Sequence, residues 1–206
     1  MTKRAVTFVV AATVAATIAG AAFAADAPAC ATPEQAQKVQ EHYKTAPGMP
    51  FQTARTLALS EAVIASALPK SQAAGTSGAA FPQVWDSVKG IKGVFLVMKG
   101  GNVFEIRGPI PGGEPSTKSK FFNLKDNDPG LGGHLRPDLI TAIYAFAIPG
   151  KEKGVVSRAV AFMDASGESV FSIAVSGEGP NPPADVITHF DKVMSVVRAQ
   201  PALCGK

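Results

Sequence analysis

The sequence predicts a single α+β domain in which N- and C-terminal helices flank a large antiparallel β-sheet. Segments of helical composition lie at both ends of the chain, and segments in which apolar side chains recur every second residue lie between them. Two of the intervening turns have the composition of β-hairpins. Helices and strands do not alternate, which argues against the parallel sheet of a βαβ protein. With 206 residues, the chain is long enough for one such domain.

The chain begins with the features of an export signal. A basic start precedes an uncharged segment over 5–25, which contains the small-x-small cleavage motif Ala22-Phe23-Ala24. We expect residues 1–24 to be a cleaved signal peptide and residues 25–206 to form a periplasmic or secreted domain with no membrane span. The alternative is an uncleaved anchor, because about twenty uncharged residues can span a bilayer. Ala and Gly make this segment only weakly apolar, which favours the signal peptide.

Two helices are predicted at the start of the mature chain. The first covers 33–43, with Thr32 placed as its N-cap and a proline in its first turn. A Pro-Gly-Met-Pro break follows at 47–50. The second covers 54–68, where apolar residues share one face and Pro69 ends the helix.

The middle of the chain is predicted to form the sheet. Small residues over 71–80 indicate a linker, and 81–88 is a short helix anchored by Trp85. Strands are predicted over 94–98, 103–106, 121–124, 139–148, 156–163 and 169–175. The turns at 99–102 and 164–167 can supply the positive φ angles that tight hairpins require.

An amphipathic helix is predicted over 184–198, at the end of the chain. Its apolar residues follow i, i+3, i+4 and i+7 spacing, namely Val186, Ile187, Phe190, Val193, Met194 and Val197. We expect this apolar stripe to dock on one face of the sheet.

Composition and motifs argue against several functions. The formal charge is only +4 and no run of basic residues occurs, which disfavours a nucleic-acid partner. The sequence contains no CxxC, HxxxH or GxSxG motif. Gly130-Leu131-Gly132-Gly133 lacks the third spaced glycine and the preceding strand of a dinucleotide-binding loop. A familiar active-site motif is therefore absent from the sequence.

The only two cysteines, Cys30 and Cys204, lie near the two ends of the mature chain. An exported protein enters an oxidising compartment, and the ends of a domain often lie close together. We therefore predict a disulfide between them. Two free thiols are the alternative, and lipidation of Cys30 is disfavoured because the cleavage motif ends the signal upstream.

Of the three histidines, His134 is the candidate functional one. His42 lies on a polar helix, where we expect it to be solvated, and His189 lies at the edge of the C-terminal apolar stripe, where we expect a structural role. His134 follows the glycine loop at 130–133 and enters a strand. Loops on a rigid sheet often carry ligand-contacting residues, and neutral imidazole is a common metal ligand.

Several short motifs occur in a fixed order along the chain. They lie at 81–85, 93–97 and 103–113, and then at Phe122-Asn123-Leu124, Gly133-His134-Leu135 and 161–167. In that order they resemble the haem-utilisation carrier proteins of the ChuX/HutX type. Each motif is short, so the resemblance is carried by their collinear order over about residues 54–198.

The resemblance implies a dimer-forming domain that binds haem b non-covalently on its sheet. His134 matches the histidine of the family's glycine loop, and a second haem-associated histidine falls on Met98 in this chain. Met98 is either an axial ligand of the iron, since His/Met ligation is known, or a core methionine. Arg107 and Arg136 are candidate partners of the haem propionates or, alternatively, solvated surface residues.

We therefore expect an exported protein that binds haem or a related tetrapyrrole for uptake, carriage or storage. A haem transporter or receptor is an expected partner. The resemblance implies a cytosolic carrier, so the export signal is a departure from the family. Two alternatives are an enzyme that modifies or degrades the tetrapyrrole and a domain that has lost haem and binds another apolar ligand or a protein. Whether the protein is an enzyme is left open, with binding favoured over catalysis.

Overall fold

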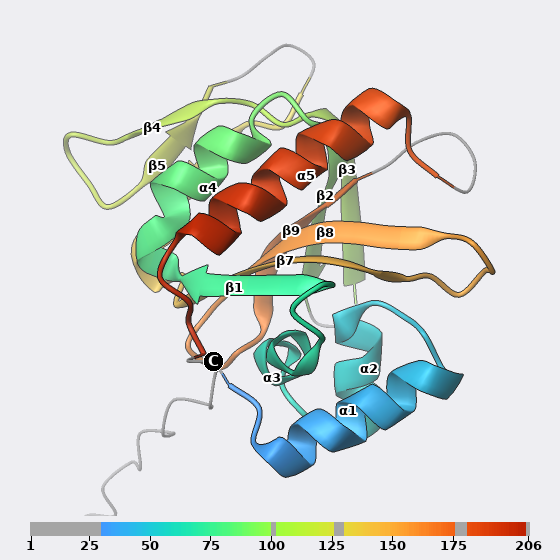
Figure 1. Ribbon diagram of the computed structural model, residues 1–206. Coiled ribbons are helices and arrows are strands. Elements are labelled where there is room, and N and C mark those ends of the chain that lie inside the picture. Colours follow the sequence, from blue (N-terminus) through green and yellow to red (C-terminus); the bar gives the residue numbers. More distant parts are fainter. Residues whose placement is uncertain (1–29, 100–101, 126–129, 176–180, 205–206) are drawn as a thin grey trace, which may run out of the picture.

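The structure is a computed structural model that describes residues 30–99, 102–125, 130–175 and 181–204 (Figure 1). It is an α+β fold with a six-stranded antiparallel sheet, a three-stranded sheet, and helices at both ends of the chain. The predicted fold class is thus confirmed. The expected signal peptide lies outside the described residues. Within these ranges, none of the helices combines the length and the apolar character needed to cross a membrane.

The N-terminal helices differ from the prediction at one point. Helix α1 (Pro33–Thr45) begins as expected, with a reciprocal capping box between Thr32 and Gln35. The single helix predicted over 54–68 is wrong, because the chain forms α2 (Pro50–Leu57) and α3 (Glu61–Ala67). Ala58 adopts a left-handed conformation with φ of 53°, and Ser60 then caps α3 by accepting a hydrogen bond from the backbone of Val63.

The predicted linker over 71–80 is also wrong, because it contains β1 (Ala73–Ser77) and the short 3₁₀ helix η1 (Gly78–Ala80). Strand β1 pairs antiparallel with β7 (Ala142–Pro149). A Cβ atom at Gly75 would lie 2.2 Å from the ring of Tyr144, so a residue without a side chain is required for this close approach. Small residues here form an edge strand rather than a linker.

The remaining predicted elements are confirmed, with small shifts at their ends. They are α4 (Phe81–Val88), β2 (Lys92–Lys99), β3 (Asn102–Pro109), β5 (Phe122–Leu124), β7, β8 (Val156–Met163), β9 (Ser169–Val175) and α5 (Ala184–Ala199). Trp85 is buried in α4, as its role of anchor requires. The strand expected from position 139 begins later, after the 3₁₀ helix η2 (Pro137–Leu139). Part of the turn between β2 and β3 lies outside the described residues.

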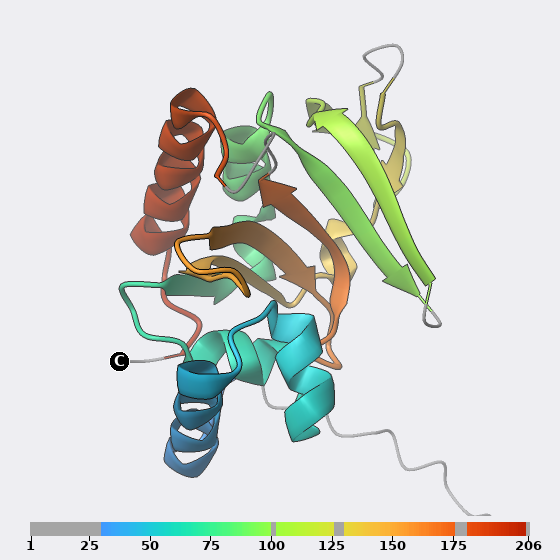
Figure 2. The ribbon, with the colours of Figure 1, turned by 90° about the vertical axis from the view of Figure 1, so that its right-hand side faces the viewer.

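The large sheet has the strand order β1-β7-β8-β9-β2-β3, and alternate residues of its strands face opposite sides. One face carries Phe95 and Phe171, whose rings stack with centroids 4.9 Å apart, and α4 and α5 cover this face. The opposite face carries Tyr144 and is covered by α3. Figure 2 shows the helices on the two sides, with the β2–β3 hairpin extending beyond them.

The small sheet consists of β4 (Gly113–Pro115), β5 and β6 (Gly133–Leu135), in that order. It packs on the α4 side of the large sheet, where Phe122 joins the same apolar core as Phe95. Strands β4 and β6 have three residues each, which is too short for a periodic pattern to reveal them.

A disulfide joins Cys30 to Cys204, as predicted, with a Cα–Cα distance of 5.7 Å. The C-terminal tail runs along β1, where Ala202 forms a β-bridge with Thr76 and the backbone N–H of Leu203 donates to the carbonyl of Gly75 at 3.1 Å. The disulfide therefore holds the tail against the outer strand of the large sheet.

Candidate functional site

His134 lies in the middle of β6, on the side of the small sheet that faces away from the core. Phe122 and Leu124 of β5 are buried in the core, and Asn123 between them pairs in register with His134 on the other side. Gly133 has φ of 131°, which disfavours any residue with a side chain immediately before the histidine. The fold therefore presents an exposed imidazole on a short but hydrogen-bonded sheet.

Asn123 selects the tautomer of the neutral His134 ring. Nδ1 of His134 lies 2.8 Å from Oδ1 of Asn123, and an amide oxygen can only accept a hydrogen bond. Nδ1 therefore carries the proton and donates a hydrogen bond to Asn123. Nε2 keeps its lone pair, and this is the form of imidazole that binds a metal.

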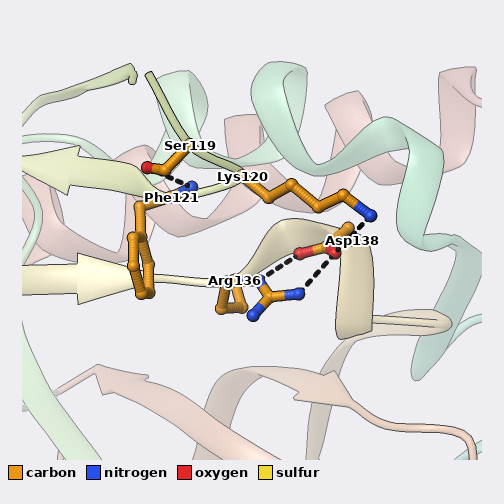
Figure 3. A network of polar contacts seen from close by, with 5 residues as sticks. All are labelled: Ser119, Lys120, Phe121, Arg136 and Asp138. Atoms are coloured by element: carbon orange, nitrogen blue, oxygen red, sulfur yellow. Dashed lines mark hydrogen bonds and ion pairs between the residues drawn. The ribbon is translucent and has the colours of Figure 1, made fainter. Parts of the chain in front are cut away.

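An aromatic ring, Phe121, lies beside His134. Figure 3 shows this ring together with the charged side chains of Lys120, Arg136 and Asp138. The rings of Phe121 and His134 have centroids 5.6 Å apart, and the guanidinium carbon of Arg136 lies 5.8 Å from the Phe121 ring centroid. Arg136 makes two hydrogen bonds of 2.7 Å to the carboxylate of Asp138, and Lys120 lies 3.7 Å from the same carboxylate. The surface thus combines an imidazole, an apolar ring and two cations.

The ion pair on this surface changes the acidity of both of its members. The hydrogen bonds from Arg136 lower the pKa of Asp138, and the same bonds raise the pKa of Arg136. Asp138 is therefore ionised at neutral pH. Together the side chains of Lys120, Arg136 and Asp138 have a net charge of +1. Such a surface suits a ligand that combines a metal, a flat apolar body and carboxylates.

The structure brings together only some of the predicted site residues. His134 and Arg136 lie together around Phe121, whereas Met98 and Arg107 belong to the β2–β3 hairpin. By strand alternation, these two face away from the side of the large sheet that packs against the small sheet. Arg107 forms an ion pair with Glu105 on its own strand. Among the described residues, no hydrogen bond, ion pair or ring contact joins His134 to either of them.

The sequence did not single out four residues of this surface, namely Lys120, Phe121, Asn123 and Asp138. The Phe122-Asn123-Leu124 motif was visible, but its register with His134 depends on a connection too long for a hairpin signal. In the ranges described, no group of three or more His, Cys, Asp and Glu side chains forms a metal site.

The other two histidines, His189 and His42, lie on helices α5 and α1. The Nε2 atom of His189 lies 2.9 Å from the carbonyl oxygen of Ser87, which links α5 to α4 and supports the structural role expected for it. His42 is half-buried on α1, whereas we expected a solvated side chain.

The chain matches a known protein family and is similar to several solved structures. The family model for haem utilisation ChuX/HutX matches residues 75–199. The solved structure of the heme-binding protein ChuX has a TM-score of 0.67 and 21% identity, covering 78% of this chain and 99% of that one. A protein from Agrobacterium tumefaciens has a TM-score of 0.65 and 25% identity, covering 79% of this chain and 91% of that one.

A third similar structure belongs to ChuS, an Escherichia coli heme oxygenase. It has a TM-score of 0.63 and 15% identity, covering 78% of this chain and 49% of that one. None of the curated proteins matches the sequence.

Proposed function

Because this chain belongs to the haem utilisation ChuX/HutX family, we propose that it binds haem b non-covalently and that His134 is its iron ligand. The family match gives the protein a haem-related function. The observation that carries the residue assignment is the hydrogen bond between His134 and Asn123, since it leaves Nε2 as the ring nitrogen with a lone pair.

The residues around His134 fit the group. His134 would hold haem through its iron, which binds an imidazole nitrogen. Phe121 offers an apolar ring beside that imidazole, and the side chain is 40% exposed, so it is available for contact. Lys120 and Arg136 offer positive charge to the propionates, although Arg136 must share its guanidinium with Asp138.

Met98 as the second axial ligand stays a prediction, and so does Arg107 as a propionate partner. Both lie on the face of the β2–β3 hairpin opposite to Phe95, whereas Lys120 and Arg136 lie beside the His134 surface and can pair with a propionate there. Met98→Ala tests the ligand assignment, because loss of a thioether ligand changes the absorption spectrum of the reduced haem complex and loss of a packing side chain does not.

We also propose that the protein carries or stores haem after export. An imidazole on an open surface suits transfer to a haem transporter or receptor better than retention, because a partner can approach the iron from outside. The expectation is tested by intact-mass analysis of periplasmic material, which should lack residues 1–24. A mass that retains them would contradict the proposed compartment.

A homodimer is the arrangement we propose for the free edge of the large sheet. Strand β3 is its outermost strand, and Val103, Phe104 and Ile106 are all at least 40% exposed on it. Edge strands that expose apolar side chains pair readily with another strand. A second copy of this chain is the partner that the family resemblance favours.

Titration of the mature protein with haemin tests the proposed function. A saturable shift of the Soret band is expected, and His134→Ala should lower the affinity at least tenfold, equivalent to about 1.4 kcal/mol. His42→Ala is the matched control and should leave the affinity unchanged. Asn123→Ala should weaken binding by a smaller factor, because the ring loses the bond that sets its tautomer.

Two results would overturn parts of this proposal. Equal affinity of His134→Ala and the unsubstituted protein would remove His134 as the ligand, and the absence of any Soret shift would favour a domain that has lost haem. Loss of Soret absorbance in the presence of O₂ and a reductant, with release of a linear product, would favour the alternative of a haem-degrading enzyme.

A further inference from the structure

A cavity of about 330 Å³ lies beside β1, at the edge of the large sheet opposite to β3. Its walls come from α3, β1, the end of α5 and the C-terminal tail, which Figure 1 shows gathered near the C-terminus. Its volume falls at the lower end of the range typical of small-molecule sites, about 300–1,000 Å³. The cavity shares none of its lining residues with the His134 surface.

The interior of the cavity is mainly apolar. Leu68, Val197 and the ring of Tyr144 provide the larger apolar surfaces, and Ala73 and Ala74 of β1 add small apolar ones. Tyr144 is only 3% exposed, and burial raises its pKa to about 12, so the phenol is neutral at physiological pH. An apolar chain placed here would lose part of its contact with water.

Among the described residues that line the cavity, the charged side chains are Lys70 and Arg198, and neither aspartate nor glutamate occurs. Arg198 donates hydrogen bonds from Nη2 to the backbone carbonyls of Lys70 at 3.1 Å and Ser71 at 3.3 Å, which position the guanidinium without neutralising it. None of the described carboxylates forms an ion pair with Arg198. A carboxylate could pair with it in a bidentate geometry.

The wall formed by the C-terminal tail is held in place by several bonds. The Thr76 hydroxyl donates to the carbonyl of Pro201 at 2.9 Å, and the disulfide anchors Cys204 to Cys30. The Tyr144 hydroxyl lies 3.2 Å from the sulfur of Cys204. The cavity is therefore formed before any ligand arrives, so binding need not order this wall.

We propose that this cavity binds a small amphipathic carboxylate, a medium-chain fatty acid in class. The carboxylate pairs with Arg198, and the alkyl chain packs against Leu68, Val197 and Tyr144. This site is separate from the His134 surface, and the inference does not rest on the proposed haem function.

Isothermal titration of the mature protein with octanoate tests the proposal, with octanol as the neutral probe of equal chain length. We expect saturable binding of one octanoate per chain and at least tenfold weaker binding of octanol. Arg198→Gln should weaken octanoate binding at least tenfold, and Arg198→Lys should restore part of it. Lys192→Gln, which removes a charge from the exposed side of the same helix, is the matched control and should leave binding unchanged.

Two cavity-filling variants test the location. Ala202→Phe fills the cavity from the exposed tail, and Ala74→Leu fills it from β1, so that misfolding of one does not decide the result. Both should abolish octanoate binding while the haemin titration stays unchanged, which separates failure here from failure of the haem proposal. No binding of octanoate, equal binding of octanol, or full binding by both filled variants would overturn the proposal.

Discussion

The two edges of the large sheet differ in how they are covered. At the β1 edge, the C-terminal tail forms a bridge to Thr76 and is locked by the disulfide, while α3 covers the adjoining face. At the β3 edge, no described segment pairs with the outer side of the strand, and Val103 and Phe104 are 56% and 57% exposed. The covering elements therefore lie at the β1 edge, and the β3 edge is the one at which we propose a partner.

The two halves also differ in where they place charge. In the β1 half, Glu61 at the start of α3 is only 8% exposed and lies beside Glu168. In the β3 half, the ion pair of Arg136 and Asp138 is exposed, and exposed pairs contribute little to stability. The buried carboxyl of Glu61 therefore affects the free energy of unfolding. The exposed side chains of Arg136 and Asp138 are available to a ligand.

The largest effect is expected from opening the covered edge. Replacing Cys30 and Cys204 by serine should lower the free energy of unfolding by about 4 kcal/mol, because the bond closes a very long loop in the unfolded chain. Urea denaturation measures this. A reductant should destabilise the unsubstituted protein by the same amount and leave the double variant unaffected. A loss below about 1 kcal/mol in the free energy of unfolding would mean that the C-terminal tail stays on β1 without the disulfide.

A smaller effect on stability is expected from Glu61, the buried carboxyl in the β1 half. Burial, and then the neighbouring Glu168, raises the pKa of Glu61 to about 7, so the folded protein binds a proton that the unfolded chain releases near pH 4.5. Stability should therefore fall as pH rises from about 4.5 to 7. Glu61→Gln should be more stable than the unsubstituted protein by about 1–3 kcal/mol at pH 8 and equal to it at pH 4.

Urea denaturation across this pH range gives the comparison for Glu61. Glu34→Gln, on the exposed first turn of α1, is the matched control and, because it keeps Glu61, should lose stability over this pH range as the unsubstituted protein does. If Glu61→Gln gained nothing at pH 8, the carboxyl would be better solvated than its position indicates.

The smallest effect on stability, with a large effect on assembly, is expected at the open edge. Phe104→Asp should convert a dimer into a monomer in light-scattering measurements, while the free energy of unfolding of the monomer changes by less than about 0.5 kcal/mol. Val170→Asp, at another exposed apolar side chain, should remain a dimer. A monomeric unsubstituted protein at micromolar concentration would remove the dimer and reduce the difference between the two edges.

The sequence was sufficient where apolar periodicity is strong. Strands β8 and β9 and helix α4 around Trp85 begin and end where the sequence predicts them. The disulfide followed from the number and position of the cysteines. By contrast, the break between α2 and α3 depends on a left-handed alanine, for which the sequence has no signal.

The candidate site shows the limit more clearly. His134 could be selected from the glycine loop before it, but Asn123 became its partner only through the register of two three-residue strands. The separation of Met98 from His134 depends on which face of the large sheet the small sheet covers. Packing of one sheet on another is a long-range outcome, and spacing along the chain does not encode it directly.

The disulfide also has a mechanical consequence. Because Cys30 and Cys204 are separated by 174 positions, a force applied to the chain outside them passes from one sulfur to the other and bypasses the folded region between. The domain would stay folded under tension as long as the bond is oxidised. After reduction, the same force would first peel the tail from β1, since its bridge and hydrogen bonds would then carry the load.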